Sequence, residues 1–339
     1  MTKLITTIAA LQLVEQGKIA LSTPAAQVLP ELADPVILTG RDAAGKPATT
    51  APARNAITLG HLLNHTSGME YHLEGTLSGS ATDRGYVKGE DSATFFEVLK
   101  GELPGLLLKF EPGTDFAYGL STDCVGFIVE RLSGKSLDQY FKDHIFTPLG
   151  ITSASFYLTP ALKERLLPLS FRNSEGTLER WNNQLTIMPQ DPEQTNVHFG
   201  GVGLYGSLKD YLTLLRHLLQ IKAGTAVAHP LLAPASVASL FEPTLPAPAT
   251  NSLAAMLGLP AGSAQFSLGL MLNTVAPPGR RSVGSGAWAG WACTSYVVDP
   301  DTGVAVVFGT QLLPAAGFDM TYEKLWVEVE EAIYAGLQK

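Results

Sequence analysis

The stretch MTKLITTIAALQLVEQGKIAL, residues 1–21, determines how the rest of the chain has to be arranged. Its apolar residues recur at helical spacing, with Leu4, Ile8 and Leu11 on one line, and Gly17 supplies a stop signal. Most of the circumference of this helix is apolar, which predicts that it is buried on nearly all sides. The other elements must therefore pack around it.

Lys3 is the one charged residue at the start of this helix. A cation at a helix N-terminus faces the positive end of the helix dipole, which is unfavourable. Two interpretations stay open. Lys3 is either a solvated lysine near a chain end, or a catalytic lysine whose pKa is lowered by burial and by the dipole.

Composition excludes several classes of function. The chain has 339 residues, of which 45% are hydrophobic and 16% are charged, enough for a sizeable core in one large domain or two small ones. A net charge of −8 without a basic cluster argues against nucleic acid as a partner, and no apolar run is long enough to span a membrane. Because Gln12, Glu15 and Gln16 stand where a signal peptide needs small residues, we expect mature protein in the cytoplasm.

The two cysteines, Cys124 and Cys293, lie far apart in the sequence. This pattern fits neither a disulfide framework nor a zinc site, so buried thiols are expected. We expect no metal and no cofactor.

The middle of the chain is predicted to be mainly helical. Residues 23–57 are rich in Pro, Ala and Gly, which predicts extended or irregular surface chain. From Thr58 helical patterns dominate, among them STDCVGFIVERLSG (121–134) and SLKDYLTLLRHLLQ (207–220). Each of these two begins with a serine, a candidate N-cap.

The last part of the chain changes to the period of strands. The strand-like runs are QFSLGLML (265–272), RRSVGSGAWAG (280–290), ACTSYVVDP (292–300) and GVAVVFGTQLL (303–313), and a helix over 321–337 follows. Strands that follow strands, with helices set apart, predict an α/β protein of the α+β type with an antiparallel central sheet flanked by helices.

Five motifs occur in one order along the chain. They are MTKL (1–4), HLLNHTSG (61–68), FEPGTDFAYGLSTDCVGFIVERLSG (110–134), FGGVGLYGSLKDY (199–211) and GSGAWAGW (284–291). Together they resemble the serine β-lactamase-like superfamily, most closely its family VIII carboxylesterase and fungal acyltransferase (simvastatin-synthase-like) branch. The resemblance covers nearly the whole chain.

The resemblance implies a β-lactamase/transpeptidase-like fold over a single domain, residues 1–339. A sheet-associated part is expected at about 1–45 and 264–339, and a mainly helical part at about 46–263. The first strands of the family's sheet are expected to be missing.

In this family the nucleophile is the serine of a Ser-x-x-Lys motif. Lys3 matches the lysine, so the serine would stand directly before Met1. No serine stands three residues before any lysine of this chain; Thr321 stands so before Lys324, but in the terminal helix, and no G-x-S-x-G elbow is present. We therefore expect the nucleophile in a segment upstream of Met1.

The resemblance also assigns the remaining site residues. Tyr118 matches the family tyrosine that acts as general base or acid beside the lysine. Leu120 stands where penicillin-active members have Asn, and Trp288-Ala289-Gly290 stands where they have Lys-Thr-Gly. These four are expected to bind a neutral acyl substrate. The backbone N–H of Trp291 is expected to form half of the oxyanion hole.

Three further segments receive an interpretation. The run that contains His65 is interpreted as a capped helix end, which gives His65 a structural role. The glycine-rich run 200–207 is interpreted as a backbone turn beside the site. Residues 69–101, with Tyr71, His72 and Tyr86, stand where the family builds variable substrate walls.

Three functions are weighed. The first is a serine hydrolase or acyltransferase that acts on small-molecule esters or thioesters through a covalent acyl-enzyme, with an acyl carrier as one kind of donor. The second is a catalytically inactive relative that binds acyl compounds, since the chain as it stands carries no nucleophile. The third, a β-lactamase or D-peptidase, is disfavoured by Leu120 and Trp288.

Overall fold

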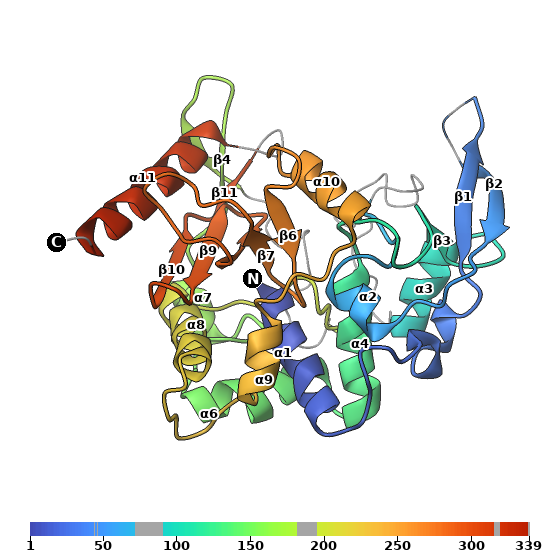
Figure 1. The fold of residues 1–339 in the computed structure, drawn as a ribbon, viewed down its shortest axis with the longest axis horizontal. Helices are drawn as coiled ribbons and strands as arrows, with labels where there is room; N and C mark the ends of the chain where they lie inside the picture. Colours follow the sequence, from blue (N-terminus) through green and yellow to red (C-terminus); the bar gives the residue numbers. More distant parts are fainter. Residues whose placement is uncertain (44, 46, 72–90, 182–194, 315–318, 338–339) are drawn as a thin grey trace.

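The computed structural model describes residues 1–43, 45, 47–71, 91–181, 195–314 and 319–337. Figure 1 shows a sheet with the long helix α11 (Met320–Leu337) on its outer side and a group of helices around α1 (Thr2–Glu15) on the other. Among the described residues no helix is long and apolar enough to cross a membrane.

The predicted antiparallel central sheet is confirmed. Its five strands follow the order β10-β9-β8-β7-β6, and every neighbouring pair is antiparallel. All of them come from the part of the sequence in which strands are predicted. The strands are β6 (Ala264–Phe266), β7 (Met271–Asn273), β8 (Gly286–Gly290), β9 (Thr294–Asp299) and β10 (Val304–Gly309).

The two faces of this sheet pack against different helices because successive side chains of a strand point to opposite faces. On β9, Tyr296 and Val298 belong to the apolar cluster that contains α1, whereas Val297 belongs to a second cluster with Trp326 of α11. Phe308 of β10 stacks on Trp326 with ring centroids 6.0 Å apart. Helices therefore cover the sheet on both sides.

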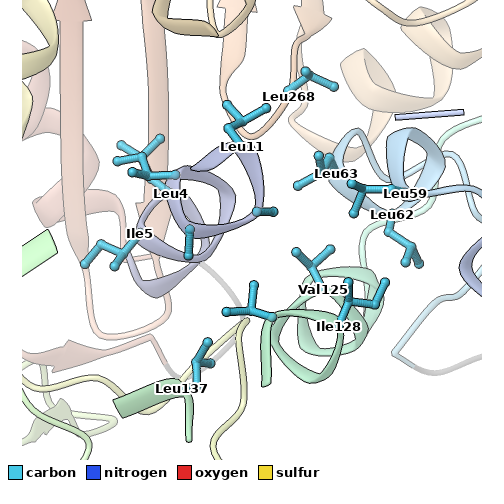
Figure 2. Close-up of a cluster of buried hydrophobic side chains, with 14 of the residues drawn as sticks. Leu4, Ile5, Leu11, Leu59, Leu62, Leu63, Val125, Ile128, Leu137 and Leu268 are labelled. Atoms are coloured by element: carbon cyan, nitrogen blue, oxygen red, sulfur yellow. The ribbon is translucent and has the colours of Figure 1, made fainter. Parts of the chain in front are cut away.

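Helix α1 lies inside the larger apolar cluster. Every residue from Thr2 to Leu13 is buried, as the apolar circumference of the helix predicts. Figure 2 shows leucine and isoleucine side chains of α1 gathered with those of α2 (Leu59–Leu63) and α4 (Ser121–Ser133). Replacing a buried leucine by alanine in such a core typically costs about 2–5 kcal/mol. Packing around α1 is therefore a main source of stability.

The remaining helices are short, apart from α8. They are α3 (Ser92–Lys100), α5 (Leu137–Phe141), α6 (Thr147–Leu149), α7 (Pro160–Arg165), α8 (Leu208–Lys222), α9 (Pro234–Ser239) and α10 (Ala247–Met256), with 3-10 turns at Ala25–Gln27 and Pro30–Leu32 and a π turn at Lys142–Phe146. α8 contacts β9 and β10, so it covers the same face of the sheet as α1.

Two small sheets lie outside the central one. β1 (Val36–Arg41) pairs with β2 (Pro47–Pro52) and with β3 (Leu107–Leu108), and β4 (Ser170–Arg172) pairs with β5 (Leu178–Arg180) and β11 (Leu312–Leu313). The β1–β2 hairpin lies in residues 23–57, for which the sequence predicts extended or irregular surface chain but no strand pairing. The hydroxyl of Thr39 on β1 donates to the hydroxyl of Thr49 on β2 at 3.0 Å. Pro and Gly in this part of the sequence conceal the pairing of the two strands.

The two predicted serine caps have different outcomes. Ser207 caps α8, because its side chain accepts the N–H of Asp210. Ser121 is already inside α4, and Leu120 is the N-cap, so that prediction was wrong. The hydroxyl of Ser121 instead bonds that of Ser67 at 2.8 Å, which ties α4 to the HTSG run.

The division of the domain at about residues 45 and 264 stays a prediction. The range 1–45, predicted to be associated with the sheet, contains strand β1, which belongs to a small sheet and not to the central one.

Candidate active site

Lys3 stands in the first turn of α1, where the helix begins next to the sheet (Figure 1). Its exposed fraction is only 6%. The interpretation of Lys3 as a solvated lysine near a chain end was therefore wrong, because the helix is buried from its first residue onward.

The direct hydrogen-bond partners of the Lys3 ammonium are neutral groups. Nζ donates to the hydroxyl of Tyr71 at 3.2 Å and to the carbonyl oxygen of Gly201 at 3.0 Å. It also lies 4.8 Å from the centre of the Tyr118 ring and 5.8 Å from that of Tyr71, within the range of cation–π attraction. Three segments far apart in the sequence thus meet at one cation.

The charge of Lys3 is favoured by its surroundings. Burial by itself lowers the pKa of Lys3, but Tyr118, Tyr71 and Asp123 outweigh burial and raise that pKa above its ordinary value. This is the opposite of the lowered pKa expected for a catalytic lysine. The phenol oxygens and the carboxylate near Nζ, which the sequence did not reveal together, are the reason.

Tyr118 lies just before α4, inside a group of aromatic rings. Trp288 donates its indole N–H to the hydroxyl of Tyr118 at 3.1 Å, and the two rings lie 5.1 Å apart. The ring of His65 lies 4.8 Å from that of Tyr118 on another side, and Tyr71 meets it edge-on at 5.7 Å. The hydroxyl of Tyr118 is therefore held in one orientation between Trp288 and the Lys3 region.

Strand β8 brings Trp288 to this place. Trp288 pairs with Tyr296 on β9, and the pairing continues through Ala289 to Gly290. A Cβ atom at Gly290 would stand 2.3 Å from the hydroxyl of Thr294, so glycine is needed for the close approach of the two strands. The Trp288-Ala289-Gly290 run is thus a regular strand that ends beside the turn to β9.

The remaining predicted residues are placed as follows. Leu120 is buried in the larger apolar cluster. Trp291 starts the turn after β8 and is 56% exposed. The substrate contacts of Leu120, Ala289 and Gly290 and the oxyanion role of Trp291 stay predictions.

The structure adds His65 to the site. His65 has a positive φ of 60°, is 1% exposed and packs on Phe116 and Phe266 as well as on Tyr118. Burial and then the charge of Lys3 keep the pKa of His65 well below its ordinary value, so the ring is neutral. It forms an uncharged wall behind Tyr118.

Asp123 and Gly201 complete the surroundings of Lys3. Asp123 is 1% exposed in the first turn of α4, and its Oδ1 accepts the N–H of Gly201 at 2.8 Å. Burial raises the pKa of Asp123 to about 6, although Lys3 acts against this. The run 200–207 therefore meets the site through the backbone of Gly201. Of the expected substrate wall, Tyr71 is described, whereas His72 and Tyr86 lie outside the described residues.

A lysine, a tyrosine and a tryptophan of three distant motifs thus share one site, and the chain also matches the model of a known family. Residues 1–328 match the family described as Beta-lactamase. The chain belongs to this family. Among the described residues no group of His, Cys, Asp or Glu is arranged to hold a metal ion.

The relatives of the chain in this family include fungal enzymes. Acyltransferase calJ of Penicillium decumbens is 35% identical over 254 residues, which cover 73% of this chain and 56% of that protein. Lovastatin esterase of Penicillium rubens is 34% identical over 268 residues, covering 77% of this chain and 62% of that protein. The chain spans little more than half the length of the curated relatives it matches first.

The fold agrees with a solved structure of the same kind. Unliganded simvastatin synthase of Aspergillus terreus superposes with a TM-score of 0.82 at 28% identity, covering 100% of this chain and 83% of that one. The antiparallel sheet with helices on both faces is thus the β-lactamase/transpeptidase-like fold that the motifs predict.

Proposed function

We propose that this chain forms the site of a serine-dependent acyltransferase or esterase that acts on small-molecule esters or thioesters through a covalent acyl-enzyme. The observation that carries the proposal is the contact between Lys3 and Tyr118. Their side chains meet with Nζ 4.8 Å from the Tyr118 ring centre, and the Tyr118 hydroxyl is fixed by Trp288. A cation beside an oriented phenol is suited to moving a proton to and from a nucleophile.

The nucleophile in this proposal is a serine joined directly to Met1. Such a serine stands three residues before Lys3, and residues at this spacing share one face of a helix. Its hydroxyl then lies on the side of α1 where Lys3 meets Tyr118.

The residues divide the work as follows. Because the surroundings of Lys3 raise its pKa, Lys3 stays charged and stabilises negative charge on the oxygens near it. Tyr118 carries the proton. The serine Oγ attacks the acyl carbon and passes its proton to the Tyr118 oxygen, while Tyr118 passes its own hydroxyl proton to the alkoxide or thiolate that leaves as its bond to the acyl carbon breaks, so that Tyr118 ends as the phenol it began as.

The second half-reaction runs in reverse. An acceptor hydroxyl or a water gives its proton to Tyr118 and attacks the acyl-serine, and the serine leaves with the proton from Tyr118. The Trp291 N–H, together with that of the serine, is proposed to hold the oxygen that becomes negative. The outcome is transfer or hydrolysis, depending on the acceptor.

The substrate proposal is a neutral acyl donor. Trp288 occupies the place of a cation that would hold the carboxylate of a penicillin, and the ring group around Tyr118 is apolar and aromatic. Relatives of the chain include a monacolin J acid methylbutanoyltransferase and a lovastatin esterase, both of which fit acyl chemistry of this kind. An acyl carrier is one donor to test.

The test is to extend the chain with its upstream segment, ending in serine before Met1, and to measure turnover of short-chain p-nitrophenyl esters and acyl thioesters. We expect a burst of p-nitrophenol that matches the enzyme concentration. A reading frame with no serine before Met1, or an extended protein that binds acyl compounds without turnover, would support the inactive binding protein instead.

A further inference from the structure

We propose that Asp123 is a positioning residue for Lys3, because its buried carboxylate holds the backbone of Gly201 in the place where the carbonyl of Gly201 receives the Lys3 ammonium. The inference rests on the proposed function only for its kinetic consequence. The arrangement itself belongs to the chain as it stands.

One residue of the loop links the two charges. Gly201 donates its N–H to Asp123 Oδ1 at 2.8 Å, and its carbonyl oxygen accepts from Lys3 Nζ at 3.0 Å. A Cβ atom at Gly201 would stand 2.8 and 2.9 Å from the two carboxylate oxygens and 3.0 Å from Nζ. The carboxylate and the ammonium therefore flank a single α-carbon, with no space for a side chain between them.

Both charges are buried, so their arrangement decides how well each is stabilised. Lys3 is 6% exposed and Asp123 is 1% exposed. Isolated buried charges are costly, so each group is stabilised by the other across Gly201. Asp123 is among the groups that raise the pKa of Lys3, and Lys3 in turn opposes the rise that burial causes in the pKa of Asp123. Asp123 thus keeps Lys3 both in place and charged.

The loop is fixed to its surroundings at neighbouring points as well. The hydroxyl of Thr6 on α1 donates to the carbonyl of Gly200 at 2.7 Å. A Cβ atom at Gly126 of α4 would stand 2.9 Å from the Gly200 nitrogen, so glycine lets the helix and the loop touch. Farther along α4, Glu130 contacts the ring of His198 at 3.3 Å. Asp123 is the carboxylate of α4 that reaches the residue bound to Lys3.

Glu130 is therefore a matched control. Both carboxylates stand on α4, two helical turns apart, but Asp123 accepts from Gly201, whereas Glu130 contacts His198 and accepts the N–H of Leu137 at 2.7 Å. Replacing Glu130 by Gln disturbs the loop without touching the contact to Lys3.

The experiment follows the ionisation of Lys3 in the chain as it stands. The protein carries 13C-labelled lysine, and the Cε signal of Lys3 is assigned by its loss in Lys3→Met. In the unsubstituted protein and in Glu130→Gln we expect this signal to keep the ammonium position up to pH 10. In Asp123→Asn, which keeps a hydrogen-bond acceptor but loses the charge, we expect neutralisation at least tenfold easier, with a midpoint below pH 10.

Gly201→Ala is the second variant, for the case that Asp123→Asn does not fold. Its methyl group pushes the two charges apart from the loop side, and the same shift of the Lys3 midpoint is expected. The proposal would be overturned if Lys3 titrated in Asp123→Asn as it does in Glu130→Gln. If Asp123→Asn does not fold, the same comparison is made between Gly201→Ala and Glu130→Gln.

The kinetic arm uses the serine-extended protein. We expect Asp123→Asn to lower kcat by about tenfold to a hundredfold with KM within about twofold, because a misplaced Lys3 ammonium stabilises the negative charge that develops in the chemical step less well. Glu130→Gln should stay within about threefold. If the extended protein has no activity at all, the proposed function fails, whereas the lysine titration still decides the role of Asp123.

Discussion

Two buried charges of this molecule are held in opposite ways. Glu330 on α11 is fully buried, and Arg281 Nη1 reaches its two carboxylate oxygens at 3.1 and 2.9 Å while Arg280 approaches at 3.5 Å. Lys3 is also buried, yet within the described part of the chain no carboxylate oxygen lies at ion-pair distance from its Nζ. Its direct partners are the neutral Tyr71 hydroxyl and a backbone carbonyl.

The difference indicates that Glu330 has a structural role, whereas Lys3 is placed to take part in a reaction. The carboxylate of Glu330 is neutralised in place, and it joins α11 to the chain before β8. The positive charge of an ammonium that has only neutral direct partners is not cancelled. It therefore stabilises any negative charge that develops nearby. Sites that leave a buried charge incompletely paired are typical of function, because the fold gains less stability there.

The largest effect is expected at the Lys3 site. In the serine-extended protein, Lys3→Ala and Tyr118→Phe should each lower kcat/KM by about a hundredfold to ten-thousandfold, because Lys3 stabilises the negative charge that develops and Tyr118 transfers the proton. Circular dichroism should show the fold unchanged. Lys324→Ala, which removes an exposed lysine of α11, is the control and should keep full activity. Losses below about tenfold in both variants would contradict the lysine–tyrosine mechanism.

At the other charge the effect falls on stability. Glu330→Ala leaves two arginines without their carboxylate, and breaking a buried pair in this way costs about 3–5 kcal/mol. Chemical denaturation should show this loss in the free energy of unfolding. Lys3→Met should cost less than Glu330→Ala, because it removes only the longer-range attraction between Lys3 and Asp123 and breaks no direct ion pair. Equal losses in the two variants would remove the distinction between the two sites.

Two aspartates should give the two regions opposite pH dependence. Burial raises the pKa of Asp123 from 3.8 to about 6, so the folded state binds its proton more tightly than the unfolded state does, and stability rises as pH falls from above 6 towards 4. Burial also acts to raise the pKa of Asp299, but the Ser282 N–H and the Tyr334 hydroxyl outweigh it and lower that pKa. Stability from Asp299 is therefore present above pH 3.8 and lost as pH falls below it.

Denaturation curves between pH 3 and pH 8 check this pair of signs. Asp123→Asn should remove the rise, and Asp299→Asn should reduce the fall in acid. A variant whose pH profile matches that of the unsubstituted protein would show that the aspartate in question does not titrate as described.

The last prediction is that the chain without the added serine does not react with acylating reagents. The chain as it stands should give no burst with a p-nitrophenyl ester and no labelling by a fluorophosphonate, since no serine of this sequence stands three residues before a lysine. Mass spectrometry of the intact protein measures both. Stoichiometric labelling of a serine in this chain would show that the site lies elsewhere.

Long periodic segments of the fold could be predicted from the sequence. The period that defines α1, α8 and the strands of the central sheet is local, so neighbouring residues reveal it. The cap of α4 could not be predicted, because Ser121 bonds Ser67, a partner far away in the sequence. For the β1–β2 hairpin, extended or irregular chain was predicted but the pairing of the two strands was missed, because proline and glycine in that region conceal the strand pattern.

The site was predictable only where a motif carries it. Lys3, Tyr118 and Trp288 were found in motifs, and the structure brings these three together. Asp123 was missed although it follows Tyr118 in the same motif, because an acidic residue in the first turn of a helix is ordinarily a helix-dipole partner. The raised pKa of Lys3 also depends on groups that only the folded chain assembles.

The most direct test of the account is the position of the acyl group in the serine-extended protein. The protein is mixed with a p-nitrophenyl acyl ester, quenched within the burst phase and digested, and the acylated peptide is sequenced by mass spectrometry. The account predicts one acyl group, on the serine that precedes Met1, with strongly reduced acylation in Lys3→Ala and Tyr118→Phe. An acyl group on another residue, or equal acylation in these variants, would contradict it.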